Sequence, residues 1–162
     1  NGGRSCCSPE VMGKTDQVDL ENSRSVLVYS TPPFEKGLEV VGDAGLTIYI
    51  STDSTDIDLI AKICLVDRAG VSKNIQDGVV RGSLRNSYWY PEEMTPGKVY
   101  RLKIDLSPIG FRVSSGERIR LTISNSSTPR FEANPSVYGP ATQHIFHNSN
   151  YPSRFVAGFQ PG

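Results

Sequence analysis

Apolar and polar residues alternate with a period of two in many short segments, and Gly, Pro, Asn, Asp and Ser separate these segments from one another. Such spacing is typical of strands that bury one face and are joined by turns. The pattern predicts about nine strands, at residues 26–30, 38–42, 46–51, 57–66, 79–84, 99–106, 118–124, 143–147 and 154–157. The helical period is weak throughout. The chain is therefore predicted to be all-β, a sandwich or a barrel.

Two of these segments also indicate which side chains face the core. Residues 57–66 carry apolar side chains at every odd position, and we expect the odd positions to be buried. Residues 99–106 alternate charged with apolar side chains, as in an antiparallel sheet with one wet face. Turns are expected at Ala69-Gly70, Asp77-Gly78 and Pro96-Gly97, because glycine tolerates positive φ and proline presets φ.

Length and charge narrow the class of protein. A chain of 162 residues has the usual size of one domain. Seventeen Lys and Arg balance seventeen Asp and Glu, so the chain lacks the basic field that binding to nucleic acid or to an anionic membrane surface requires. No apolar run approaches the roughly 18 residues of a spanning helix. We expect a soluble domain with neither a nucleic-acid nor a membrane partner.

The N-terminal residues resemble neither a native start nor a signal peptide. Residues 1–5 lack an initiator Met and an apolar stretch, which suggests a piece of a longer chain. We expect residues 1–24 to form a linker or joint and residues 25–162 to form the sandwich domain.

The cysteines and histidines predict no metal site. Cys6 and Cys7 are adjacent and Cys64 is distant, an odd count that does not form a disulfide framework. Free thiols favour the cytoplasm, although the native compartment is open on this evidence. His144 and His147 are expected on opposite faces of one strand, where they cannot share a zinc ion. Cys64 is expected to be a small core residue.

Catalytic and cofactor motifs are missing from the sequence. It contains no G-x-S-x-G nucleophile elbow, no phosphate loop and no dinucleotide fingerprint. Asp53, Asp56 and Asp58 could offer oxygen ligands to calcium, but they lack the glycine and the distal glutamate of an EF-hand loop, and turn chemistry explains them better. We therefore predict no catalytic, cofactor-binding or metal-binding residue.

The run Tyr88-Trp89-Tyr90 is the most unusual local feature. Three consecutive aromatic residues cannot all face one side of a strand, so at least one is expected to be exposed. Exposed rings could stack on a sugar or on a partner protein. The alternative is that these rings close the open end of the core.

Seven ordered segments carry a resemblance to a known family, and they are Leu27–Pro33, Asp56–Lys62, Asp77–Arg81, Pro96–Tyr100, Ser115–Leu121, Pro129–Phe131 with Asn134-Pro135, and His147 with Pro152–Arg154. They are similar to the C-terminal domain of the X-Pro dipeptidyl-peptidase and cocaine-esterase (CocE/NonD) family of serine hydrolases. The match covers nearly the whole chain. Gly2–Pro9 also resembles the joint that follows the catalytic domain in some bacterial members.

The resemblance implies a fold and a role. It implies a jelly-roll-like, galactose-binding-like antiparallel β-sandwich that packs on an α/β-hydrolase domain, and every triad residue of the family precedes the joint. The hypothesis is then a non-catalytic accessory domain that helps to shape a hydrolase active site. Alternatives are a stand-alone carbohydrate or small-ligand module that uses Tyr88, Trp89 and Tyr90, and a chain that self-associates through the sheet face that a hydrolase would cover.

Overall fold

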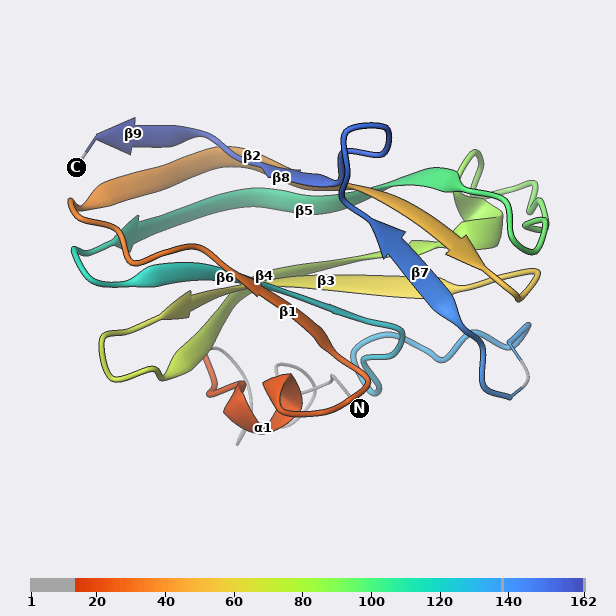
Figure 1. Cartoon of the computed structure of the whole chain (residues 1–162), viewed down its shortest axis with the longest axis horizontal. Helices are drawn as coiled ribbons and strands as arrows, with labels where there is room; N and C mark the ends of the chain where they lie inside the picture. The colour runs from red at the N-terminus through yellow and green to blue at the C-terminus, as the bar shows by residue number, and fades with distance from the viewer. Residues whose placement is uncertain (1–13, 138, 162) are drawn as a thin grey trace.

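The computed structural model describes residues 14–137 and 139–161, and it is built almost entirely of strands (Figure 1). Cys6, Cys7 and the first thirteen positions of the expected joint lie outside the described residues. The elements are α1 (Val18–Glu21), β1 (Leu27–Ser30), β2 (Leu38–Thr52), β3 (Asp58–Val66), β4 (Ser72–Arg81), the 3-10 turn η1 (Gly82–Leu84), β5 (Tyr100–Val113), β6 (Arg118–Ser124), β7 (Gln143–Phe146), β8 (Arg154–Val156) and β9 (Phe159–Pro161).

Two antiparallel sheets face each other and enclose the core. One sheet has the order β1-β6-β3-β4, and the other has β5-β2-β7, with β8 and β9 pairing farther along β2. Ile48, Ile63 and Leu106 are fully buried between the sheets. The predicted all-β antiparallel sandwich of about nine strands is confirmed. No helix among the described residues is long and apolar enough to cross a membrane.

Some strand boundaries differ from the prediction. The segments 38–42 and 46–51 are one strand, β2, which bends at a bulge between Asp43 and Gly45. The pattern is interrupted there by the bulge and not by a turn. The segment predicted at 79–84 starts earlier, at Ser72, and its last three residues form η1.

The Asp77-Gly78 pair is not a turn, and that prediction was wrong. Gly78 lies within β4, and a Cβ atom on it would lie 2.1 Å from the carbonyl oxygen of Asp105 on β5. The glycine is required for close approach, which brings the edge strands of the two sheets together on one side of the sandwich. Gly70 and Gly97 do occupy turns, with φ of 88° and 79°.

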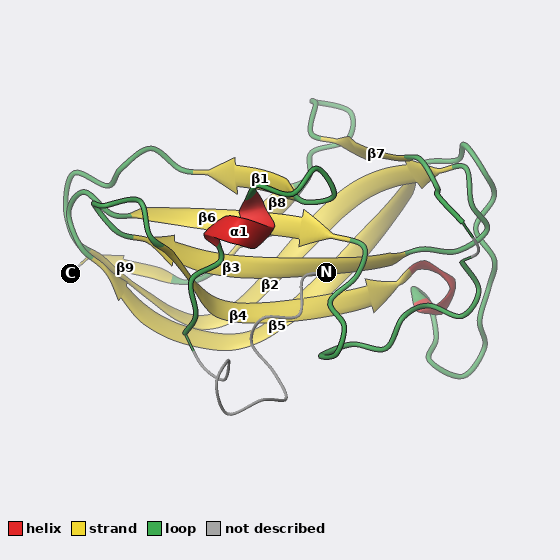
Figure 2. Ribbon diagram, turned by 90° about the horizontal axis from the view of Figure 1, so that it is seen from below, coloured by secondary structure: helices red, strands yellow, loops and turns green. Residues whose placement is uncertain are grey.

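Strand β3 is buried on both faces. Its odd positions Leu59, Ala61 and Ile63 join the core as predicted. The even positions are also buried, and at Ile60 and Lys62 the segment around α1 lies across this outer face of the sheet (Figure 2). Gln17 of that segment is 2% exposed, and its Oε1 accepts a hydrogen bond of 2.9 Å from Lys62 Nζ.

Burial on the outer face of β3 shifts the pKa values of two of its side chains. Burial lowers the pKa of Lys62. Burial also raises the pKa of the Cys64 thiol to about 12, and Cys64 is fully buried. Cys64 is thus a buried residue as expected, although it lies under the α1 segment and not between the sheets.

We predict that Cys64 is inert to thiol reagents while the chain is folded. In a Cys6→Ser/Cys7→Ser background at pH 8, the raised pKa leaves roughly one thiol in ten thousand ionised, and only the thiolate reacts. Labelling with a disulfide reagent should therefore be about a thousandfold slower in buffer than in urea. Equal rates in the two solvents would show that the α1 segment does not cover β3.

We also predict that Gly78→Ala destabilises the domain by about 1–3 kcal/mol, because the new methyl group forces β4 away from Asp105. Gly110→Ala on β5 is the matched control, since a Cβ there meets nothing within 4 Å. The free energy of unfolding in urea would be measured for both variants. If Gly78→Ala is as stable as Gly110→Ala, the two sheets are not in close contact at this point.

Candidate functional site

The three aromatic side chains singled out in the sequence lie together on the surface. Tyr88, Trp89 and Tyr90 are 86%, 86% and 77% exposed, in the loop between η1 and β5. They do not close the end of the core. Met94 and Ile57 are buried at this end instead.

The loop that carries the rings is held by short-range hydrogen bonds. Ser87 Oγ accepts hydrogen bonds from the backbone N–H groups of Trp89 and Tyr90. The Arg85 guanidinium donates to the carbonyl oxygens of Gly82 and Glu92, at 2.9 and 2.6 Å. These bonds fix the backbone on both sides of the aromatic run, so the rings are presented from an ordered turn.

A buried carboxylate network anchors this end of the sandwich. Asp56 is 3% exposed and accepts hydrogen bonds from the N–H and Oγ of Ser83, both at 2.7 Å, and from Asn134 Nδ2 at 3.0 Å. Asp58 forms a two-pronged ion pair with Arg81 at 2.8 and 2.9 Å. This hydrogen bond raises the pKa of Arg81. Asn134 also donates to Asp58, and so it ties a distant loop to both aspartates.

The aspartates thus serve the fold, as the turn interpretation favoured. Asp53 accepts a hydrogen bond from the N–H of Thr142, away from the other two. In residues 14–137 and 139–161 no cluster of three or more His, Cys, Asp or Glu side chains is arranged to hold a metal ion. His144 lies opposite Ser51, and His147 meets the Tyr29 ring edge-on at 6.2 Å. Within the same residues neither imidazole hydrogen-bonds to a serine or a cysteine.

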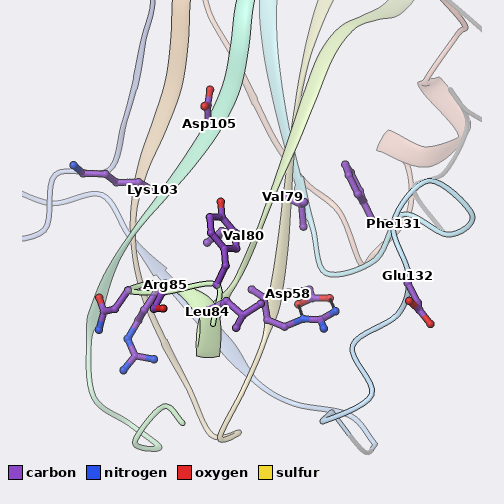
Figure 3. A pocket seen from close by; sticks show the side chains of 13 residues that line it. Asp58, Val79, Val80, Leu84, Arg85, Lys103, Asp105, Phe131 and Glu132 are labelled. Carbon is purple, nitrogen blue, oxygen red and sulfur yellow. Dashed lines mark hydrogen bonds and ion pairs between the residues drawn. The ribbon is translucent and has the colours of Figure 1, made fainter. Parts of the chain in front are cut away.

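A cleft of about 400 Å³ begins beside the aromatic run (Figure 3). Tyr88 forms part of its wall. Strands β4 and β5, which belong to different sheets, supply Val79 and Lys103, and the loop after β6 supplies Phe131 and Glu132. Its walls carry both signs of charge around a few apolar side chains. Such a lining suits a surface that exchanges polar and aromatic contacts with another protein or a sugar.

Sequence reasoning located the aromatic run but missed most of the cleft. Phe131 and Glu132 are about thirty residues from Lys103 along the chain, and no local spacing joins them to the strands. The segments 129–131 and 134–135 were singled out only through the family resemblance. That resemblance was the available signal for the loop that faces the cleft.

The chain matches, over residues 5–156, the family model described as the X-Pro dipeptidyl-peptidase C-terminal non-catalytic domain. It belongs to this family. Its resemblance to the CocE/NonD hydrolases is thereby confirmed.

Known proteins resemble this family member in sequence or in fold. The chain is 28% identical to the cocaine esterase of Rhodococcus sp. (strain MB1 Bresler) in an alignment of 155 residues that covers 89% of the chain and 27% of that esterase. It superposes with a TM-score of 0.84 on an aminopeptidase from a marine sediment Thaumarchaeota archaeon, at 23% identity over 90% of this chain and 27% of that one. An α-amino acid ester hydrolase gives a TM-score of 0.84 at 20% identity, over 91% of this chain and 27% of that one. The chain therefore spans about a quarter of the length of these proteins.

We predict that Asp56→Ala destabilises the domain by about 1–3 kcal/mol, because it leaves the N–H and hydroxyl of the half-buried Ser83 without their acceptor. Asp53→Ala is the matched control, since Asp53 is exposed and accepts a single hydrogen bond. Urea unfolding and the amide spectrum of the loop carrying Trp89 would be compared. Equal stability of the two variants would contradict an anchoring role for Asp56.

Proposed function

We propose that this chain is the accessory domain of a larger serine hydrolase, in which it packs on an α/β-hydrolase domain and helps to shape the active site. One observation carries the proposal. Nearly the whole chain aligns with only about a quarter of the cocaine esterase. The family model that the chain matches is described as non-catalytic. Catalysis, in this proposal, belongs to the remaining three quarters of such a protein.

The aromatic run is the contact that we assign to the hydrolase domain. Tyrosine and tryptophan are enriched among the residues that dominate binding energy at protein interfaces. Burial of a large apolar side chain stabilises a complex by about 1.5–3 kcal/mol, and one loop exposes three such rings at consecutive positions. Lys103, Asp105 and Glu132 around the adjacent cleft would form the polar rim.

The same rings support the second candidate, a carbohydrate-binding module. An exposed aromatic face beside a polar cleft is a surface on which a sugar ring can stack.

A cytoplasmic location is part of the first proposal, because a reducing compartment suits the free thiol of Cys64.

The test uses the reading frame that encodes this chain. It should encode a hydrolase domain before Asn1, and that domain, produced separately, should bind the 162-residue chain in calorimetry. We expect Trp89→Ala to weaken this binding tenfold or more, as for residues at the centre of an interface. Val156→Ala is the control, because Val156 is also exposed, at 54%, but lies on β8 away from the cleft.

Three results would contradict the proposal. One is a reading frame without a hydrolase domain, and another is binding that Trp89→Ala leaves unchanged. The third is saturable binding of a glycan that is lost in Trp89→Ala, which would establish the carbohydrate module instead. Sedimentation of the chain alone would separately detect self-association.

A further inference from the structure

The two long sides of the sandwich differ. On one side β4 and β5 are pressed together at Gly78. On the other side β1 is the end of its sheet and pairs only with β6, while β7 and β8 pair only with β2. Figure 2 shows β1, β8 and β7 along this second side, opposite β4 and β5. No strand among the described residues bridges the two sheets there.

A cavity of about 340 Å³ opens in this gap, and we call it the edge cavity. Its lining comes from both sheets and consists of Tyr29, Leu46, Ile48, Leu121, Ile123, Ile145, His147, Ser153, Arg154 and Phe155. Ile48 and Leu46 are core residues, only 0% and 4% exposed. The edge cavity therefore reaches from the surface to the core and is deeper than a surface groove.

The edge cavity has few polar groups, and none of them is acidic. Ser153 is already used, because its Oγ donates to the carbonyl of Phe146 and accepts from the N–H of Tyr49 where β2 changes partner from β7 to β8. This leaves the phenol of Tyr29, the imidazole of His147 and the guanidinium of Arg154. The lining contains no carboxylate, and Arg154 forms no ion pair with any acidic side chain of the described residues.

The size and lining define a ligand class. Small-molecule sites occupy about 300–1,000 Å³ and combine apolar walls with a few polar groups. A cavity of about 150 Å³ is enough for a benzene ring, so the edge cavity has room for one ring and a short chain. A basic lining without acidic residues is complementary to an anion, and a carboxylate fits the donors of Tyr29 and Arg154.

We propose that the edge cavity binds a small amphipathic carboxylate, a single aromatic ring or short aliphatic chain that ends in an acid group. The apolar part lies against Ile48, Leu121 and Ile145, and the acid group lies at the mouth with His147 and Arg154. This site uses no residue of the aromatic run, so it does not depend on docking to a hydrolase domain.

The test uses 3-phenylpropionate as the probe and 3-phenylpropanamide as its uncharged counterpart, both titrated into the purified chain. We expect saturable shifts of the amide signals of Tyr29, Leu121 and Ile145, with tighter binding of the acid. Arg154→Gln should weaken binding of the acid by about fivefold, the upper range for an exposed charge pair, and leave binding of the amide unchanged. Arg112→Gln, an exposed arginine on β5, is the matched control.

A filled-cavity variant keeps the proposal falsifiable. Ile145→Phe places extra volume in the edge cavity and should abolish binding of both probes, while its amide spectrum shows that the fold is retained. The proposal is overturned if neither probe gives saturable shifts at these residues. It is also overturned if Ile145→Phe is folded and still binds, or if Arg154→Gln and Arg112→Gln affect the acid equally.

Discussion

The contact between β4 and β5 determines the shape of the whole domain. A glycine at position 78 lets one backbone approach the carbonyl of Asp105, and any side chain there would hold the strands apart. The edge strands of the two sheets meet along this line, and the sheets separate on the opposite side. The cleft beside the aromatic run and the edge cavity both follow from this contact. The cleft lies outside the line of contact, between β4, β5 and the loop carrying Phe131, and the edge cavity lies where the sheets separate.

Buried charge organises the end of the sandwich beside that cleft. A carboxylate that is removed from water must be surrounded by donors, and Asp56 obtains them from Ser83 and Asn134 on two different loops. The arrangement costs desolvation, but it makes each loop depend on the other. The order of the turn that presents Trp89 is thus coupled to residues far from it in sequence.

Local pattern was sufficient for the strands and for one face of β3. Leu59, Ala61 and Ile63 were predicted to be buried from their period alone, and they are. Lys62 occupies the position that the pattern assigns to solvent. It is buried because Gln17, forty-five residues away, lies over it, and no periodicity encodes such a cover. Gly78 shows a second limit. An Asp-Gly pair looks the same in the sequence whether the glycine forms a turn or lets two strands approach closely.

The same distinction applies to the candidate sites. The sequence alone was enough to find the aromatic run Tyr88-Trp89-Tyr90, because its unusual property is that three aromatic residues are consecutive. The edge cavity could not be found in this way, because Tyr29, Ile48, Ile145 and Arg154 are unremarkable strand residues that become a site only through the separation of the sheets. A partner docked on the aromatic loop would contact different elements from those around the cavity. In the two proposals together, a protein bound at the loops and a small acid bound at the open side would therefore not compete.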